Sequence, residues 1–238
     1  MIEKTPILLI TYRRSVNLED ILSKLLNFGF KFIYVYSNCW NNNSIHKKEV
    51  EISRKIIEDL EKKFNKKFFL NFSNIHLSVD KSITSAINWF FTNVEYGIIL
   101  EDDIKISLMS MEFISSALDF YKNSNDIASI TSFTEYPFNK YIETIRPRYS
   151  FMFHSWGWGT WRKVWDKFDH LEDCNYEIKK DHELFKYNSS LANSFQRILL
   201  KCKQRKIITW DYQFQNFCFI NDLKNLMPTM PLVENLGI

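Results

Sequence analysis

Apolar and polar positions along the first hundred residues follow two alternating patterns. Short apolar runs rich in β-branched residues predict strands over 7–12, 32–38, 68–73 and 96–104. Between them, apolar residues at helical spacing predict helices over 17–28, 46–65 and 82–94, and Asn17 is the candidate N-cap of the first. Strands that alternate with helices predict an α/β fold, in which helices cover both faces of a mostly parallel central sheet.

The second half of the chain follows these patterns less regularly. A helix is predicted over 109–123, a strand over 127–133 and a long helix over 181–206. An aromatic block fills 154–165, and an apolar helix begins within 209–217. Because the sequence has no internal repeat and no clear linker, we expect a single domain over 1–238.

Composition and charge exclude several classes of protein. The 238 residues carry a net charge of only +3, which does not indicate a general grip on nucleic acid, although a mildly basic face would suit an anionic nucleotide or an anionic membrane. The four cysteines lack metal-ligand spacing, and the N-terminal apolar run is too short for a signal peptide or a membrane span. We therefore expect a cytoplasmic protein, with peripheral attachment to the inner membrane left open.

The strongest candidate for chemistry is the acidic triplet Glu101-Asp102-Asp103, which directly follows an apolar strand. Ligands of open α/β sheets bind beyond the carboxyl ends of the strands, where Tyr12-Arg13 and Ser37-Asn38 are also expected. Adjacent carboxylates repel one another unless a cation neutralises them, and hard oxygen ligands suit Mg²⁺ or Mn²⁺ shared with a diphosphate. A solvated acidic turn is the alternative, but the buried strand before the triplet favours the metal site.

The aromatic block His154-Ser155-Trp156-Gly157-Trp158-Gly159-Thr160-Trp161 is the second candidate. Glycine lets the backbone approach a ligand, and indole faces stack on the C–H surfaces of sugars, so Trp156 and Trp158 are expected in a substrate pocket. Trp161 and Trp165, four residues apart, are expected on the buried face of a helix.

Asp211, within Trp210-Asp211-Tyr212-Gln213-Phe214, is the third candidate. A partly desolvated carboxylate could take the proton from an attacking hydroxyl, whereas an Asp near a helix N-terminus is commonly only a cap, and the sequence leaves both roles open. Sequence signatures of P-loop, dinucleotide-binding, serine hydrolase and zinc protease sites are absent. Hydrolysis by paired carboxylates stays conceivable but fits the adjacent acids less well.

Several stretches in order resemble the GT-A superfamily of glycosyltransferases, whose fold is Rossmann-like. They are PILLITYRR, TSAINWFF followed by EYGIILEDD, HSWGWGTWRKVWDKFD, and TWDYQF with the trailing PLVENLG. More narrowly, the chain resembles bacterial nucleotide-diphospho-sugar transferases of the hemolytic-protein-like group, which are distant relatives of the Golgi N-acetylglucosaminyltransferase. The resemblance implies a hexosyltransferase-type, inverting enzyme that transfers a sugar to a glycan hydroxyl in surface polysaccharide, lipopolysaccharide or glycoconjugate synthesis.

The resemblance also implies roles for individual residues. Residues 1–104 would bind the nucleoside-diphosphate sugar, with a UDP-sugar favoured, and residues 105–238 would bind the acceptor and carry the base Asp211. Asp103 would contact Mn²⁺ or Mg²⁺ directly, and Asp102 would lie near the metal or the ribose. The remaining donor contacts would be Thr11, Tyr12, Arg13, Asn38, Lys81, Glu101, Trp156, Gly157 and Trp158.

Two segments depart from the pattern of these relatives. Ser37-Asn38 replaces an Asp-Gly pair, and residues 76–81 replace a glycine-rich phosphate loop, of which only Lys81 is retained. Relatives also carry a short further tail, often with a His, after the segment that matches residues 235–238. These departures keep two alternatives open: a nucleotide-sugar-binding module without catalysis, and a lectin that binds free sugar through its indoles.

Overall fold

The computed structural model describes residues 2–135, 146–168, 177–207 and 209–237, and its centre is a large mixed sheet. Eight described strands join in the order β3-β2-β1-β4-β8-β6-β9-β7. Their bounds are β1 Ile7–Thr11, β2 Ile33–Ser37, β3 Phe69–Phe72, β4 Tyr96–Glu101, β6 Ile127–Thr131, β7 Arg148–Ser150, β8 Trp158–Trp161 and β9 Lys224–Met227. A separate two-stranded sheet pairs β5 (Ile104–Lys105) with β10 (Glu234–Asn235).

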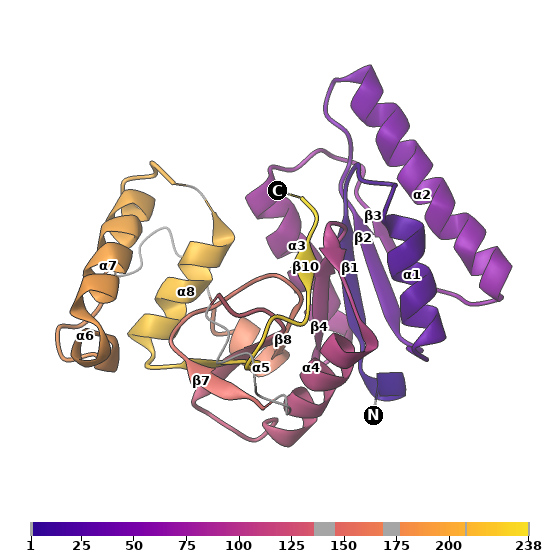
Figure 1. Cartoon of the computed structure of the whole chain (residues 1–238). Helices are drawn as coiled ribbons and strands as arrows, with labels where there is room; N and C mark the ends of the chain where they lie inside the picture. The colour runs from indigo at the N-terminus through magenta and orange to yellow at the C-terminus, as the bar shows by residue number, and fades with distance from the viewer. Residues whose placement is uncertain (1, 136–145, 169–176, 208, 238) are drawn as a thin grey trace.

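The predicted mostly parallel sheet is confirmed. β1 pairs in parallel with both β2 and β4, β2 with β3, and β6 with β9. Only β8 and β7 run against their neighbours. The first four strands therefore end at one edge of the sheet, and the antiparallel strand β8 joins them to the half that sequence patterning described poorly (Figure 1).

Helices cover both faces of the sheet. The described helices are η1 Ile2–Lys4, α1 Leu18–Asn27, α2 Ser44–Phe64, α3 Val79–Asn93, α4 Leu108–Phe120, α5 Arg162–Trp165, α6 Glu183–Tyr187, α7 Ser189–Lys203 and α8 Trp210–Ile220. In Figure 1, α1 and α2 lie on one side of the sheet and α3 on the other. A methyl group added at Gly97 would meet Phe90 of α3 at 2.3 Å, and one at Gly159 would meet Ile114 of α4 at 2.8 Å, so both glycines permit close helix packing.

The structure changes some sequence-based boundaries. The helix predicted over 181–206 is interrupted at Asn188, whose extended backbone and side-chain bond from Leu191 N–H start α7 separately. The predicted strand 96–104 ends at Glu101, and Ile104 begins β5. Trp161 lies in β8 rather than on a helix, although it is buried as expected. Asn17 precedes α1, but its side chain makes no capping hydrogen bond.

Two apolar cores hold the described residues together. The larger one fills the space between the main sheet and its helices. The smaller one joins α6, α7 and α8 through Ile178, Leu184, Ala192, Leu199, Cys202 and Phe219. We call residues 177–207 the α6–α7 lobe, which lies at the left of Figure 1. None of the described helices is long and apolar enough to cross a membrane.

Candidate functional site

A cavity of about 340 Å³ lies beyond the carboxyl ends of β1, β2 and β4, and we call it the strand-end pocket. Six predicted donor-site residues line it: Thr11, Tyr12, Arg13, Asn38, Glu101 and Asp102. Its other lining residues are Ile10, Asn41, His46, His76, Leu77, Ser78, Val79, Ser82 and Ile83. The structure thus brings together residues that lie up to 92 positions apart in the sequence, because three parallel strands end side by side.

Burial makes two acids of the triplet unusual. Desolvation raises the pKa of Glu101 to about 8, and the charges of Asp103, Asp102 and Asp211 add to this effect. Desolvation likewise raises the pKa of Asp102 to about 6, although a hydrogen bond from Tyr12 N–H to Asp102 Oδ2 (2.9 Å) opposes the rise. Without a cation, Glu101 is therefore mostly protonated at pH 7, and a cation bound at the end of β4 would favour its charged form.

Asp103 is held differently from its two neighbours. Its carboxylate forms an ion pair with the Arg14 guanidinium, and its backbone carbonyl accepts a hydrogen bond from Leu236 N–H (2.7 Å). Among the residues that the structure describes, no three His, Cys, Asp or Glu side chains gather as a ready-made metal cage. Any metal at this corner would need additional ligands, such as phosphate oxygens and water.

Asn38 is a structural part of the pocket wall. It is only 4% exposed, and its Nδ2 donates to the Leu77 carbonyl at 2.8 Å. Its Oδ1 accepts hydrogen bonds from the backbone N–H groups of Cys39 and Leu77. The side chain that was predicted to contact the donor therefore ties the end of β2 to the segment before α3.

Arg54 of α2 supports the same wall and was not singled out from the sequence. Its guanidinium donates to the carbonyls of Ser37, Asn38 and Ser73 at 2.8–3.3 Å. Burial lowers its pKa. The sequence signal that could have found it is its place between Ser53 and Ile57, on the side of α2 that packs inward. An Arg at such a position is partly removed from water and needs several hydrogen-bond acceptors.

Two buried polar atoms of the strand-end pocket lack hydrogen-bond partners among the described residues. They are Thr11 Oγ1 and the Tyr12 hydroxyl oxygen. The Tyr12 ring lies 5.7 Å from His76 and 6.5 Å from His46, measured between ring centroids. Buried polar atoms without partners are rare in folded proteins, so a polar ligand or water is expected beside them.

Lys81, which was predicted to contact the donor, is exposed and does not line the pocket.

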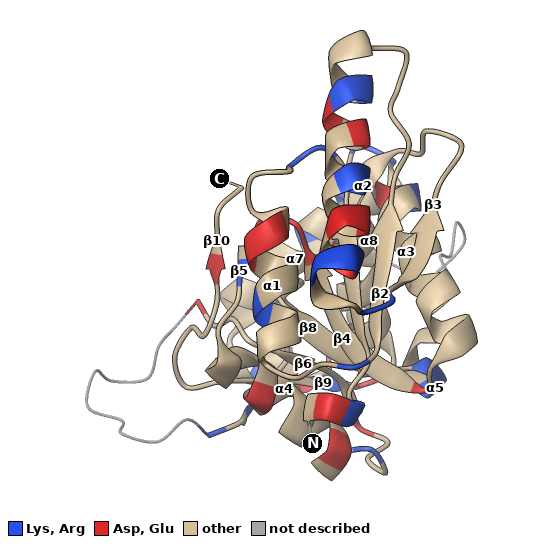
Figure 2. Ribbon diagram, turned by 90° about the vertical axis from the view of Figure 1, so that its right-hand side faces the viewer, with Lys and Arg blue, Asp and Glu red and all other residues tan. Residues whose placement is uncertain are grey.

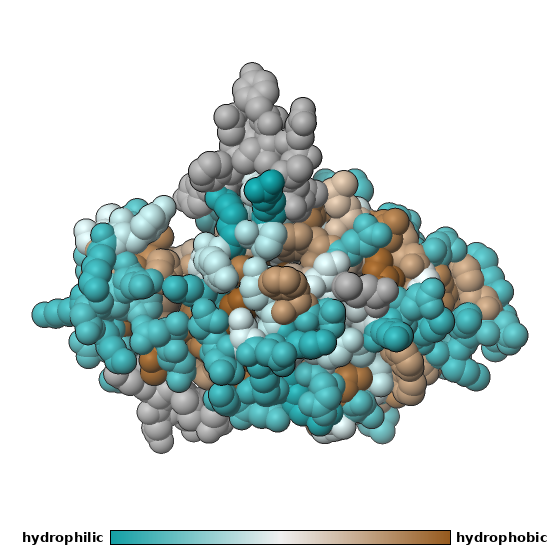
Figure 3. Space-filling view, turned by 90° about the horizontal axis from the view of Figure 1, so that it is seen from below, coloured by the Kyte–Doolittle hydropathy of each residue, from teal (hydrophilic) through white to brown (hydrophobic). Residues whose placement is uncertain are grey.

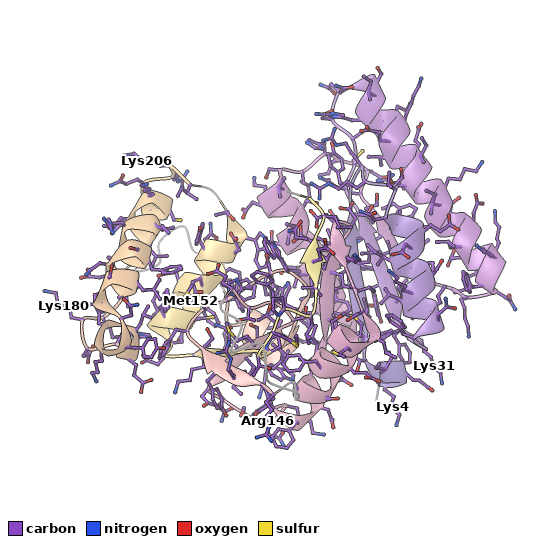
Figure 4. All side chains as sticks on the ribbon, viewed as in Figure 1. Lys4, Lys31, Arg146, Met152, Lys180 and Lys206 are labelled. Atoms are coloured by element: carbon purple, nitrogen blue, oxygen red, sulfur yellow. The ribbon has the colours of Figure 1, made fainter. Side chains whose placement is uncertain are left out.

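A second cavity, of about 270 Å³, contains Asp211 and Trp156, and we call it the aromatic pocket. The remaining lining residues are Glu135, Met152, Phe153, His154, Ser155, Phe195, Tyr212 and Gln215. Figure 4 shows Met152 beside α8. Five of these residues were not predicted as site residues from the sequence: Glu135, Met152, Phe153, Phe195 and Gln215. Gln215 lies one helical turn after Asp211, which is the signal that could have found it.

Asp211 is the second residue of α8 and is not its N-cap. The N-cap position belongs to Thr209, whose hydroxyl donates to Asp211 Oδ1, and Tyr212 N–H donates to the same oxygen at 2.9 Å. Among the described residues, Asp211 Oδ2 has no hydrogen-bond partner. The charge of Asp211 also contributes to the raised pKa of Glu101, so the aromatic pocket and the strand-end pocket interact electrostatically.

Trp158 and Gly157 do not line either pocket. Trp158 is 1% exposed and stacks on Trp210 with ring centroids 5.6 Å apart. Gly157 has a φ of +63°, and a Cβ there would lie 2.8 Å from Ser132 Oγ, so glycine is needed for the backbone turn. Regular alternation along an extended segment would put Trp156 and Trp158 on the same side, but the positive φ of Gly157 between them breaks it, and only Trp156 reaches a pocket.

Histidine 154 lies in the aromatic pocket in a largely apolar setting. Its ring makes an edge contact with Phe133 at 5.2 Å, and burial lowers its pKa, with the Glu135 charge acting in the opposite direction. The neutral form is therefore favoured at pH 7, in which one ring nitrogen can donate a hydrogen bond and the other can accept one.

Comparison with known proteins gives little beyond this geometry. No family profile matches the chain, and neither does any curated protein sequence. One solved structure with a similar fold is a 4-diphosphocytidyl-2C-methyl-D-erythritol synthase from Anaerococcus prevotii, at 11% sequence identity and a TM-score of 0.42. The match covers 79% of this chain and 83% of that one. A similarity this low assigns the chain neither to a family nor to an activity.

Proposed function

We propose that the protein is a metal-dependent, inverting glycosyltransferase that moves a sugar from a nucleoside diphosphate to a hydroxyl of a glycan acceptor. One observation carries the proposal. The acidic end of β4 lines a pocket at the edge of a parallel sheet, and a carboxylate suited to act as base lies in a second pocket whose charge reaches the first. The donor and the acceptor would therefore each have a cavity of their own, and acidic side chains line both cavities.

The donor nucleotide would occupy the strand-end pocket. The Tyr12 ring offers a flat face to a base, and the partnerless Thr11 Oγ1 and Tyr12 hydroxyl offer hydrogen bonds to a base or ribose. Arg13 lines the same pocket and supplies positive charge for phosphate oxygens. A UDP-sugar is the favoured donor on the sequence resemblance.

The residues present fit a divalent cation only together with the donor. Mg²⁺ and Mn²⁺ are commonly held by one or two carboxylates plus substrate phosphates, and Asp103 and Asp102 would be those carboxylates. When bound, the cation would neutralise charge on the departing diphosphate. The ion pair between Arg14 and Asp103 must then open, which would free the Arg14 guanidinium for phosphate oxygens.

Asp211 would act as the general base. Thr209 and Tyr212 hold its Oδ1, which leaves Oδ2 for the acceptor hydroxyl. In one step, Oδ2 takes the hydroxyl proton, the acceptor oxygen bonds to the anomeric carbon, and the bond from that carbon to the diphosphate oxygen breaks. The diphosphate leaves with the bonding electrons, and the configuration at the anomeric carbon inverts.

The aromatic pocket would select the acceptor by charge. Glu135 and Asp211 are its charged side chains, and no Lys or Arg is among the described residues that line it. Carboxylates repel anionic groups in a partly desolvated pocket, so the accepting sugar would be neutral or carry an amine. Trp156 and Tyr212 supply apolar ring surface for the C–H face of such a sugar.

A nucleotide-sugar-binding module without turnover is the second candidate function. The observation that favours it is the Arg14–Asp103 ion pair, which already satisfies the carboxylate that the metal would need. Such a module would bind nucleotide tightly yet transfer nothing to any acceptor. A lectin that binds free sugar through its indoles is less favoured, because Trp158 is buried in the core.

Transfer assays with Asp211→Asn would test the proposal. With a UDP-sugar, Mn²⁺ and a panel of neutral and amino-sugar acceptors, the variant should lose about 10²- to 10⁴-fold in kcat, the usual contribution of a general base. Nucleotide affinity measured by calorimetry should stay unchanged. Asp119→Asn is the matched control, because it removes an exposed carboxylate from α4. Full turnover by Asp211→Asn would refute the base, and nucleotide binding without turnover by the wild type would favour the binding module.

A further inference from the structure

Positive charge is concentrated in the α6–α7 lobe. Residues 177–207 contain eight Lys or Arg and three Asp or Glu, a net charge of +5, although the whole chain has a net charge of only +3. No acidic residue occurs between Glu183 and Asp211. The lobe is therefore basic and the rest of the chain is slightly acidic, an asymmetry that the overall charge conceals.

The lysines of the lobe are not neutralised by neighbouring acids. Lys201, Lys203 and Lys206 are exposed and form no ion pair among the described residues. α2 provides the contrast, because its basic side chains alternate with acidic ones in Figure 2. There Lys47 pairs with Glu51 and Lys62 with Asp59. α2 thus has a balanced solvated surface, whereas α7 presents uncompensated charge.

Packing fixes the direction in which this charge points. α7 buries Ala192, Leu199 and Cys202 against the smaller core, which turns the opposite face outward. Arg197 and Lys201 lie four residues apart on that outer face, and Leu200 between them is 44% exposed. The outer face therefore combines basic side chains with an exposed apolar one.

Further basic residues of the lobe extend this surface beyond α7. Lys206 lies at the upper end of the lobe and Lys180 on its outer flank in Figure 4. Tyr187, which follows Lys186 at the end of α6, is 81% exposed. Seen from below in Figure 3, the lobe at the left is mostly hydrophilic with smaller hydrophobic patches. The favourable interaction of basic side chains with a helix C-terminus would explain Lys201 and Lys203, but not Lys180 or Lys206.

We propose that the α6–α7 lobe docks on the surface of an anionic lipid bilayer. Basic side chains attract acidic headgroups, and an aromatic and an aliphatic side chain among them can enter the headgroup region. A nucleic acid is less suited, because the lobe offers exposed Leu200 and Tyr187 in addition to charge. The docking rests on the lobe alone and is independent of the proposed transfer reaction.

Docking through this lobe would hold the aromatic pocket on the inner side of α7, about one helix diameter from the docked face. Phe195 of α7 lines that pocket, and Lys206 precedes Asp211 by only five residues. If glycosyl transfer is the function, an acceptor sugar carried on a membrane lipid would reach the pocket by extending past α7. That consequence depends on the proposed function, whereas the docking itself does not.

Vesicle sedimentation with the purified full chain tests the docking. We expect the chain to sediment with phosphatidylcholine vesicles that contain about 30% phosphatidylglycerol, and not with phosphatidylcholine alone. Salt at about 0.5 M should release it, because screening shortens the range of the attraction. The triple variant Lys201→Gln, Lys203→Gln, Lys206→Gln should lower partitioning on the order of 100-fold.

A matched triple variant separates the lobe from general charge. Lys48→Gln, Lys55→Gln and Lys62→Gln remove the same charge from exposed positions of α2 and should leave partitioning unchanged. Circular dichroism would confirm that both triple variants fold. Equal losses of vesicle partitioning in the two variants would overturn the proposal. A wild-type chain that does not sediment with anionic vesicles would overturn it as well. Retention on soluble polyphosphate without vesicle binding would likewise exclude the bilayer as the partner.

Discussion

The two pockets of this molecule are built in opposite ways. The strand-end pocket takes Thr11, Asn38 and Glu101 from the ends of three strands that pair in parallel register. The aromatic pocket draws on four separate segments of the second half, and no shared strand end aligns them. Its walls depend on the burial of rings such as Trp158 and Phe153, which pack 4.9 Å apart. Sheet topology therefore creates the first pocket, and long-range packing creates the second.

At neutral pH, the largest effect is expected when the indole of Trp158 is removed, because this ring packs against Phe153 in the wall of the aromatic pocket. Trp158→Ala should lower the free energy of unfolding by about 3–5 kcal/mol, because it leaves a large cavity in the core. Trp156→Ala, two residues earlier and partly exposed, should cost less than about 1.5 kcal/mol. Urea unfolding of both variants is the measurement. Equal losses would show that Trp158 is not the buried support.

This contrast also explains which parts of the structure the sequence could predict. The four parallel strands and helices α1, α2 and α3 follow from local periodicity, and the acids at the end of β4 follow from the rule that ligands bind beyond strand ends. Periodicity did not reveal β8, because WGTW mixes small and aromatic residues and is buried on both faces. It therefore could not show that Trp158 points into the core while Trp156 points into a pocket.

Contacts far apart in the sequence were also beyond prediction. The guanidinium that binds the carbonyls of Asn38 and Ser73, just after β2 and β3, comes from Arg54, in the middle of a helix that looks solvent-exposed in sequence. Asn38 looked like a donor contact because it follows a strand, yet its amide is used to tie two segments of the wall together. Likewise, Lys81 was expected beside phosphate, but its side chain is exposed outside the pocket lining.

The next effect concerns how stability depends on pH, and we expect it to come from the strand-end pocket. Glu101 has a pKa of about 8 in the folded state against an ordinary value of 4.5, so the folded state binds a proton that the unfolded state has lost. Stability from this group is fully present below pH 4.5 and declines as pH rises to about 8. Without divalent cations, Glu101→Gln should remove that decline, which amounts to about 5 kcal/mol for this shift.

Urea unfolding of the wild type and Glu101→Gln at several pH values measures this effect. Glu112→Gln, on exposed surface of α4, is the control and should follow the wild type. If Glu101→Gln lost stability with rising pH as steeply as the wild type, the acidic strand end would not be the source of the decline.

A smaller effect is expected at the wall of the strand-end pocket. Asn38→Ala should cost about 1–3 kcal/mol, because it leaves the partly buried carbonyl of Leu77 and two backbone N–H groups without their partner. Asn74→Ala changes an exposed loop residue and should alter stability by less than about 0.5 kcal/mol. Thermal unfolding compares the two variants, and similar midpoints would argue against the structural role of Asn38.

The smallest effect is predicted for Lys81. Because its side chain lies outside the pocket lining, Lys81→Gln should change the nucleotide Kd by less than about threefold. Tyr12→Leu removes a ring that lines the pocket and should weaken binding more than that. Calorimetric titration with UDP would rank the two variants, and the reverse ranking would restore Lys81 as a phosphate contact.

A crystal grown with a UDP-sugar and Mn²⁺ tests the central claim most directly. We expect nucleotide in the strand-end pocket and an anomalous manganese signal between Asp103 and the diphosphate, with the Arg14 guanidinium moved off that carboxylate. A structure with nucleotide bound elsewhere, or with the Arg14–Asp103 pair intact and no metal beside it, would contradict the account.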